Sequence, residues 1–277
     1  MAPWSEYHHR SSTMLGCLAL TRVLLLLIAG DGGGGLQGWD SGAHATFYGD
    51  IHGNDTMMGA CGYGNLFEQG YGLKTTALST VLFRNGATCG ACYAIMCIHS
   101  PWCLPDRPVI RVTATNFCPP NYTRATEVWC NPPQKHFDLS MPMFLKIAHY
   151  RAGIVPVAFR RVRCDPKRGG IRFEMKGNEW WLMVLVYNVG GDGQVVDVKI
   201  KGTRTGWVGM SRNWGQNWQT WVVLRGQALS FRVTTSDGKV IQSDNVAPPD
   251  WMPGRTYEGR NFPDSYFYSK FGILPSK

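Results

Sequence analysis

A short segment in the middle of the chain, His136-Phe137-Asp138, combines two side chains that can exchange protons. If the segment is a β-strand, its two-residue period places His136 and Asp138 on the same face. A carboxyl whose pKa is raised by burial can act there as a proton donor. The competing interpretation is structural: Asp138 caps the helix that is predicted just after it. Taken alone, the triplet favours the structural interpretation.

A second segment, Thr46-Phe47-Tyr48, carries hydroxyl groups at strand spacing. Thr46 and Tyr48 would share one face of a strand, so both hydroxyls could line a groove. The competing interpretation is an ordinary amphipathic strand that buries Phe47 in a core. That interpretation is again favoured when the segment is considered by itself.

The second half of the chain is rich in tryptophan, with six of the eleven lying within 42 residues. These six are Trp180, Trp181, Trp207, Trp214, Trp218 and Trp221. A small domain cannot easily bury all of them, and aromatic rings stack on the flat C–H faces of pyranose sugars. We therefore expect some in the core and two or three in an exposed line that binds β-glucan chains. The polar spacer Gly215-Gln216-Asn217 makes Trp214 and Trp218 candidates for exposure.

Strand-like runs separated by turn residues position the first two segments. They cover residues 44–48, 109–115 and 154–162. One helix is expected to begin at Ser140 and to reach Tyr150, and a second short helix is expected over 76–83. These elements indicate a small β-barrel with peripheral helices.

After residue 168 the pattern is that of strands alone. Apolar runs cover residues 170–177, 180–189, 195–202 and 229–235, and Asp237-Gly238 marks a hairpin turn. Seven or eight short strands without helical periodicity indicate a β-sandwich. The chain is therefore expected to be mainly β, with two domains that meet in a polar, turn-rich stretch.

Nine cysteines are present, and the eight that follow Cys17 all lie between residues 61 and 164. They are Cys61, Cys89, Cys92, Cys97, Cys103, Cys118, Cys130 and Cys164. An even number in an exported chain indicates disulfides. A zinc site is disfavoured because Cys89-Gly-Ala-Cys92 is a single CxxC knuckle, and zinc sites usually pair two. No metal or other cofactor is expected.

The N-terminus is typical of a secretory signal peptide. A short apolar run over residues 23–29 follows Arg10 and Arg22 and precedes several small residues, so residues 1–38 are predicted as the leader, with the cleavage site left open. The run is too short to span a membrane, and no second one follows, which leaves at most peripheral membrane association. Sequons at Asn54 and Asn121 predict glycosylation and agree with secretion.

The net charge of +9 is spread over both halves of the chain without a basic tract. A nucleic-acid-binding protein would more often show a basic stripe or a recognition helix, so nucleic acid is not an expected partner. Spread positive charge fits weak attraction to an acidic matrix such as pectin, or solubility alone. Nothing indicates an obligate oligomer, and a monomer is expected.

Several long motifs follow one another along the chain. They include His44-Ala-Thr-Phe-Tyr48, Gly59-Ala-Cys-Gly-Tyr-Gly-Asn65, Val112-Thr-Ala-Thr-Asn-Phe-Cys-Pro-Pro120, His136-Phe-Asp-Leu-Ser140, Lys201-Gly-Thr-Arg-Thr-Gly-Trp207 and Met210-Ser-Arg-Asn-Trp-Gly-Gln-Asn-Trp218. Together they resemble the plant α-expansins from residue 39 to about residue 262. The chain is accordingly divided into an endoglucanase-type barrel domain over 39–168, a cellulose-binding domain over 169–262 and a C-terminal extension over 263–277.

The resemblance implies a six-stranded double-ψ β-barrel, similar to the endoglucanases of glycoside hydrolase family 45, followed by an immunoglobulin-like β-sandwich. It also implies four disulfides, which join Cys61 to Cys89, Cys92 to Cys164, Cys97 to Cys103 and Cys118 to Cys130. The implied activity is acid-favoured slippage between cellulose and matrix glucans such as xyloglucan, in the extracellular cell wall. It requires no cofactor and involves no net hydrolysis.

The resemblance also assigns roles to single residues of the barrel. Asp138 matches the carboxylic acid that protonates the glycosidic oxygen in the related endoglucanases. Thr46 and Tyr48 match hydroxyls that line the same groove, and His136 sits beside the acid.

In the second domain, the resemblance points to a flat face that binds polysaccharide. Trp181 and Trp214 match aromatic residues of that face, and Trp218 is a further candidate. A protein that only binds carbohydrate, without any mechanical effect, is an alternative interpretation of these residues.

One residue departs from the family pattern. An inverting glycosidase needs a second carboxylate, about 6.5–9.5 Å from its acid, and expansins are understood to lack it. Asp50 stands where the related endoglucanases place that base and where Gly is expected in an α-expansin. We hypothesise that Asp50 restores weak β-1,4-endoglucanase activity, although the loop over 51–58 resembles expansins.

Overall fold

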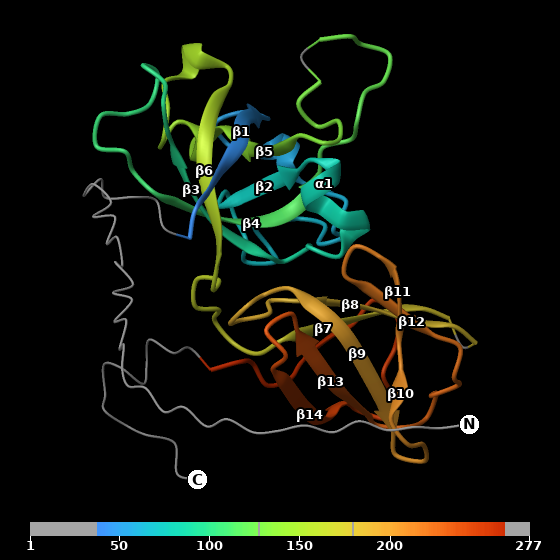
Figure 1. Ribbon diagram of the computed structural model, residues 1–277. Helices are drawn as coiled ribbons and strands as arrows, with labels where there is room; N and C mark the ends of the chain where they lie inside the picture. Colours follow the sequence, from blue (N-terminus) through green and yellow to red (C-terminus); the bar gives the residue numbers. More distant parts are fainter. Residues whose placement is uncertain (1–37, 127, 179, 264–277) are drawn as a thin grey trace, which may run out of the picture. The chain divides into compact units, whose positions relative to one another are not determined.

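The computed structural model describes residues 38–126, 128–178 and 180–263 of the chain (Figure 1). The predicted leader, except for its last residue, and nearly all of the predicted C-terminal extension lie outside these residues. The barrel and the sandwich described below both belong to one compact unit, Leu36–Lys277.

Six strands of the first half close into a barrel (Figure 1). They are β1 (Asp40–Tyr48), β2 (Thr75–Leu78), β3 (Cys92–Cys97), β4 (Ile110–Phe117), β5 (Lys135–Ser140) and β6 (Val155–Val162). Their order around the barrel is β1-β5-β2-β4-β3-β6. The pairs β1·β5 and β2·β4 are parallel, and the other four are antiparallel. The expected six-stranded barrel is therefore confirmed.

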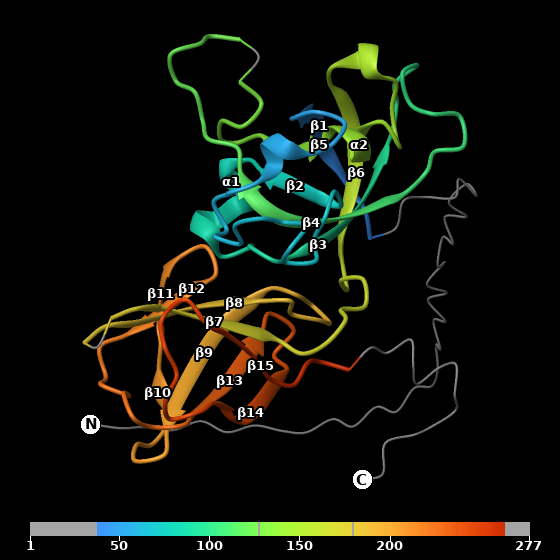
Figure 2. The same ribbon diagram turned by 180° about the vertical axis from the view of Figure 1, so that it is seen from behind.

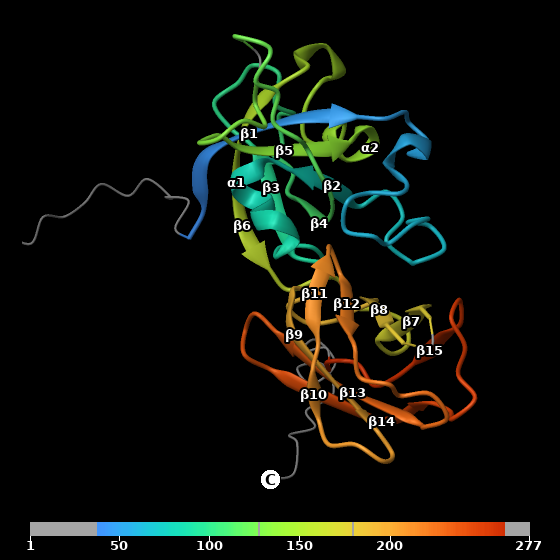
Figure 3. The same ribbon diagram turned by 90° about the vertical axis from the view of Figure 1, so that its right-hand side faces the viewer.

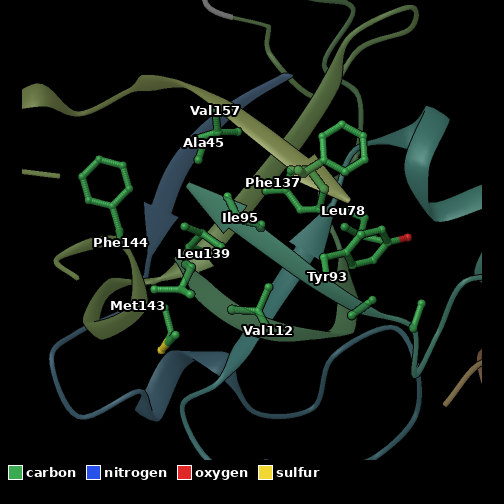
Figure 4. Close-up of a cluster of buried hydrophobic side chains, with 14 of the residues drawn as sticks. Ala45, Leu78, Tyr93, Ile95, Val112, Phe137, Leu139, Met143, Phe144 and Val157 are labelled. Atoms are coloured by element: carbon green, nitrogen blue, oxygen red, sulfur yellow. The ribbon is translucent and has the colours of Figure 1, made fainter. Parts of the chain in front are cut away.

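Apolar side chains fill the barrel because each strand alternates between inside and outside. Ala45 of β1 and Phe137 and Leu139 of β5 are fully buried and point toward the other strands (Figure 4). The residues between them in sequence, such as Thr46 and Asp138, consequently lie on the outer surface of the same two strands. The candidate chemistry is thus carried on the outside of a rigid, packed barrel.

The helices are shorter than the sequence predicts. Residues 76–78, expected in a helix, belong to β2, whose four residues are all buried, and the α-helix α1 covers only Thr80–Phe83. A short apolar run that is buried on both faces does not distinguish a strand from a helix by its period, which explains the error.

The helix expected over 140–150 is likewise reduced to α2, Met141–Phe144. Ser140 is its N-cap residue, as predicted, but the Ser140 hydroxyl donates to the carbonyl oxygen of Leu73 at 2.6 Å and not to the helix. Three 3-10 helices complete the barrel domain: η1 (Asn54–Thr56), η2 (Arg84–Gly86) and η3 (Tyr150–Ala152).

The second half forms two sheets (Figure 2). The strands are β7 (Arg172–Gly177), β8 (Leu182–Tyr187), β9 (Val195–Gly202), β10 (Val208–Gly209), β11 (Ser211–Trp214), β12 (Asn217–Thr220), β13 (Leu229–Thr235), β14 (Val240–Ala247) and β15 (Thr256–Glu258). One sheet has the order β10-β9-β13-β14 and the other β11-β12-β8-β7-β15. Phe173 and Phe231 stack between them with ring centroids 4.1 Å apart. The expected β-sandwich is confirmed.

Four disulfides staple the barrel domain in the pairings that the resemblance implies: Cys61–Cys89, Cys92–Cys164, Cys97–Cys103 and Cys118–Cys130. All eight cysteines lie before the first strand of the sandwich. The sandwich is held by its apolar core, whereas the barrel combines a core with covalent links.

The turn between β11 and β12 contacts the barrel directly. The backbone N–H of Gln216 donates to Cys61 O at 3.0 Å, and its side-chain Nε2 donates to Cys89 O at 2.9 Å. Gly215 has a φ of +52°, and a Cβ there would lie 2.5 Å from Cys61 O. Only glycine fits this position without a shift of the backbone.

The outer face of β8 also packs against the barrel. Leu185 and Tyr187 are nearly fully buried and belong to the same apolar cluster as the barrel side chains. Asn188 N, just after β8, donates to the hydroxyl of Tyr71 at 3.3 Å. The contact between the two β-domains is therefore partly apolar and partly hydrogen-bonded.

Candidate functional site

The parallel pairing of β1 with β5 brings the first two candidate segments together (Figure 3). In this register Thr46 lies opposite Asp138, and His44 lies opposite His136. The two segments are 90 residues apart in sequence, as the Thr46–His136 contact shows. We call the outer surface of β1 and β5 that carries Thr46, Tyr48, His136 and Asp138 the barrel groove, after the groove that the resemblance implies.

A hydrogen-bond relay joins three of these side chains. The Thr46 hydroxyl donates to Asp138 Oδ1 at 2.7 Å and lies 2.8 Å from His136 Nε2. Because the single hydroxyl proton is used on Asp138, the Thr46 oxygen accepts from His136, which fixes the imidazole proton on Nε2. Asp138 makes no cap to α2, so the structural interpretation of this residue is wrong.

Burial sets the protonation states of this relay. Desolvation raises the pKa of Asp138 from 3.8 to about 6, opposed by the hydrogen bond from Thr46. Desolvation, aided by the nearby His44, lowers the pKa of His136 from 6.5 to about 4. Between pH 4 and 6 the folded protein therefore holds a neutral carboxylic acid beside a neutral imidazole, whereas both groups would be charged in an unfolded chain.

Tyr48 adds an unused hydroxyl to the barrel groove. Its Oη is buried and makes no hydrogen bond of normal geometry with any residue that the structure describes, and the same holds for His136 Nδ1. Burial raises the pKa of Tyr48 to about 12, although the Asn116 amide opposes the shift. The phenol therefore stays protonated.

Asp50 lies in the turn after β1, where local groups occupy its carboxylate. Oδ1 accepts from the backbone N–H groups of His52 at 3.0 Å and Asn54 at 3.1 Å, and Oδ2 accepts from Asn54 Nδ2 at 3.1 Å. Desolvation is the largest single effect on this carboxyl and raises its pKa, but the hydrogen bonds together outweigh it and lower the pKa of Asp50. A carboxylate held in this way is a weaker general base, because each hydrogen bond stabilises its charged form.

The opposite shifts of Asp138 and His136 predict an unusual pH dependence of stability. Asp138 has a raised pKa when folded, so its contribution is complete below about pH 4 and is lost as the pH rises through 6. His136 has a lowered pKa, so its contribution is complete above 6.5 and is lost as the pH falls through 4. The two slopes cancel between pH 4 and 6. In Asp138→Asn only the histidine slope remains, and the free energy of unfolding should rise by about 3 kcal/mol from pH 4 to 6 relative to the unaltered chain.

Urea unfolding of both chains at pH 4, 5 and 6, with the disulfides intact, measures this difference. Asp138→Asn keeps an oxygen that can accept from Thr46, so the relay geometry is preserved. A difference between the two chains that does not change with pH would show that the pKa of Asp138 is not raised.

Several aromatic side chains lie on or beside the five-stranded sheet, and one of them, Trp214, also lies close to Gly62 of the barrel domain. Trp181 Nε1 donates to Gln219 Oε1 at 3.0 Å, and its ring centroid lies 6.1 Å from that of Trp221. Trp221 is 71% exposed, and Trp214, at the end of β11, is 47% exposed. We call Trp181, Trp214 and Trp221 the aromatic platform.

Trp218 does not belong to the aromatic platform, which corrects the sequence prediction. It is only 3% exposed and lies in the sandwich core, with the Arg212 guanidinium 4.3 Å from its ring centroid. The reason is the two-residue period of β12: Gln219 faces outward, so its neighbour Trp218 faces inward. The same alternation could have identified Trp221, two residues after Gln219, as an exposed ring.

The remaining predictions concern modification, membranes and metals. Asn54 and Asn121 are both exposed, and their glycosylation stays a prediction. In the described part of the chain, no helix is long and apolar enough to cross a membrane. Nor do the described residues include a group of three or more His, Cys, Asp or Glu side chains placed to hold a metal ion.

Comparison with protein families gives two matches. Residues 171–248 match the family described as the expansin C-terminal domain, and residues 75–159 match the family described as lytic transglycolase. Among similar proteins, Expansin-A22 of Arabidopsis thaliana is 64% identical over 219 residues, which are 79% of this chain and 77% of that protein. Expansin-A7 of the same plant is 53% identical and covers 78% of this chain and 83% of its own length.

Two solved structures share the fold. The crystal structure of apo expansin from Clavibacter michiganensis has a TM-score of 0.60 and 22% identity, covering 80% of this chain and 98% of its own. A mutant of that bacterial protein, solved in complex with cellohexaose, has a TM-score of 0.58 and 21% identity over the same shares. At this identity the likeness concerns the fold alone.

Proposed function

This chain belongs to the expansin family, and from that membership we propose that it loosens plant cell walls by weakening the non-covalent adhesion between cellulose and matrix glucans, without hydrolysis. The similarity to named plant expansins over most of the chain supports the loosening activity. The mechanism, the absence of hydrolysis and the matrix partners are our proposal.

The observation that carries the proposal is the carboxylic acid of Asp138 in the barrel groove, which burial keeps protonated in mild acid. Asp138 is a neutral acid below about pH 6 and is oriented by Thr46. It can then donate a hydrogen bond to an oxygen of a glucan chain, competing with the hydrogen bonds that join this chain to its neighbour. Above pH 6 the carboxylate can only accept, so the loosening should be favoured by acid.

The lack of cutting follows from what surrounds the acid. Inverting hydrolysis requires a second carboxylate that activates water. The candidate for this second carboxylate is Asp50. Its side chain accepts hydrogen bonds from backbone N–H groups of the turn at residues 50–54, and its pKa is lowered. We therefore place loosening first and keep weak β-1,4-endoglucanase activity as the second candidate, favoured only by the presence of Asp50 at this position in the sequence.

The aromatic platform supplies the attachment to cellulose in this proposal. The exposed rings of Trp214 and Trp221 and the half-buried ring of Trp181 can stack on the C–H faces of glucose units, while Trp218 stabilises the sheet from within. The bacterial relative solved with cellohexaose supports a glucan as ligand of the fold. Xyloglucan and pectin are the further matrix partners that we propose.

Two measurements on one preparation test the proposal. Heat-killed wall strips held under load should extend when the protein is added at a pH below the pKa of about 6 of Asp138, and not at neutral pH. Soluble β-glucan incubated with the same protein should release no more reducing sugar than with Asp50→Gly. Sugar release that depends on Asp50 would favour the endoglucanase, and absence of extension would leave only a carbohydrate-binding protein.

We further propose that the protein is secreted, acts in the extracellular wall as a monomer, and carries glycans at Asn54 and Asn121. The four disulfides support secretion, because such links persist in oxidising compartments.

A further inference from the structure

A cleft of about 590 Å³ lies away from both the barrel groove and the aromatic platform. Its walls come from the loop 67–74, strand β4, the segment 165–168 and the first residue of β7, Arg172, together with Cys92 of β3 and Asn188 after β8. This volume is within the range of sites that hold small ligands or single sugar units. None of the residues assigned to the groove or the platform lines it.

The cleft gathers positive charge that is scattered in the sequence. Its cationic lining residues are Lys74, Arg111, Lys167, Arg168 and Arg172, and its acidic ones are Glu68 and Asp165. Asp165 pairs with Lys74 at 3.0 Å and with Arg111 at 3.4 Å. The charge that appears evenly spread along the chain is therefore concentrated by the fold in one place.

Two of the cations are not directly ion-paired within the described part of the chain. Lys167 and Arg168 form no ion pair with any residue that the structure describes, whereas Arg172 lies 3.6 Å from Glu258. Because unpaired cations that share a cleft repel one another, this arrangement favours the binding of an anion.

The position of the Lys167 ammonium group in the cleft is fixed by its contact with an aromatic ring. Its Nζ lies 4.6 Å from the ring centroid of Tyr71. Tyr71 is itself fixed, since its ring packs on Tyr63 with centroids 4.6 Å apart and its hydroxyl accepts from Asn188 N. Burial lowers the pKa of Lys167, although Asp165 opposes the shift. The ammonium has therefore lost part of its hydration, and a bound anion would replace it.

We propose that this cleft binds a uronate unit of an acidic wall polysaccharide, with the uronate carboxylate between Lys167 and Arg168. The inference rests on the proposed function only in taking a wall polysaccharide as the ligand. The net charge suggests only a weak, non-specific attraction to pectin, whereas this proposal assigns the binding to a defined site.

The remaining lining favours a charged sugar over a compact anion. The carboxylate oxygens of Glu68 and Asp165 can accept hydrogen bonds from the hydroxyls of a sugar, and sulfate offers no such donors. Phe67, which is 51% exposed at the edge of the cleft, offers an apolar surface to the C–H face of a sugar ring. Cations, acceptors and an aromatic ring together match a carboxylated sugar.

Calorimetric titration of the full chain with tetragalacturonate tests the site. Lys167→Gln should weaken binding by about 10- to 100-fold, because a charge-assisted hydrogen bond is lost. Arg168→Gln should weaken it in the same direction, and Lys167→Arg should retain most of the affinity. The matched control is Lys199→Gln, an exposed lysine of β9 outside the cleft, which should change the affinity by less than about twofold.

Three results would overturn the inference: equal weakening by Lys167→Gln and Lys199→Gln, equal binding of the fully methyl-esterified tetramer, or equally tight binding of inorganic phosphate. The first would indicate diffuse attraction, the second a site that ignores the carboxylate, and the third a general anion site. If Lys167→Gln fails to fold, Arg168→Gln gives the same comparison from an exposed position.

The test is independent of the proposed function. Trp181→Ala should reduce binding to cellulose and leave tetragalacturonate binding unchanged, since Trp181 does not line the cleft. Loss of wall extension with uronate binding intact would contradict the proposed function alone. Intact extension without a Lys167-dependent uronate site would contradict this inference alone.

Discussion

Replacing Asp138 with asparagine should reduce acid-induced wall extension to the level of buffer alone. The two side chains have the same shape, and the asparagine oxygen can still accept the hydrogen bond that Thr46 donates at 2.7 Å. What disappears is the acidic proton, which the folded protein holds up to about pH 6. The measurement is the extension rate of heat-killed wall strips under constant load, over a series of pH values.

Two controls distinguish the loss of the acidic proton from misfolding of the variant and from loss of cellulose binding. Asp138→Asn should bind cellulose as the unaltered chain does, because the aromatic platform lies on the sandwich. Asp138→Glu should recover part of the extension, since the acid is restored in an altered position. Full extension by Asp138→Asn would show that the barrel groove does not act through this group.

Removing the Cys92–Cys164 disulfide should lower the free energy of unfolding by about 4 kcal/mol. The cysteines are separated by 72 residues, and in the chain-entropy account a link stabilises more as the loop that it closes grows. Urea unfolding of Cys92→Ser/Cys164→Ser at neutral pH measures the change. A loss of this size is a large part of the stability of an ordinary domain.

The Cys97–Cys103 link provides the matched comparison within the same barrel. It spans only 6 residues, so the same reasoning predicts a loss of about 2 kcal/mol for Cys97→Ser/Cys103→Ser. Equal losses in the two double variants would contradict the loop-length explanation. They would point instead to local packing around the sulfur atoms.

Much of the architecture could be predicted from local patterns, because alternation and turn residues act over a few positions. The strands over 195–202 and 229–235 coincide with β9 and β13. The predictions for residues 76–78 and for Trp218 are wrong for one shared reason: a short buried run looks the same in sequence whichever element or face carries it. Burial is decided by partners that lie far away along the chain.

The sequence identifies the two segments of the candidate site, but it does not show that they lie side by side. Each of the segments around Thr46 and Asp138 favoured a structural interpretation alone, and only the family resemblance joined them. The parallel register of β1 and β5 supplies the missing relation. The cleft around Lys167 and Arg168 could not be predicted, since its charges come from segments that no local pattern connects.

The buried outer face of β8 determines how the sandwich domain would behave if it were produced without the barrel. Leu185 and Tyr187 are 1% and 3% exposed because they pack with the apolar residues of the barrel. In a shortened chain that starts at residue 169, both side chains would be exposed to solvent on the same sheet as the platform tryptophans. The enlarged apolar surface would favour aggregation. A soluble sandwich fragment would therefore need polar replacements at these two positions, while the aromatic platform that we propose to bind cellulose stays unchanged.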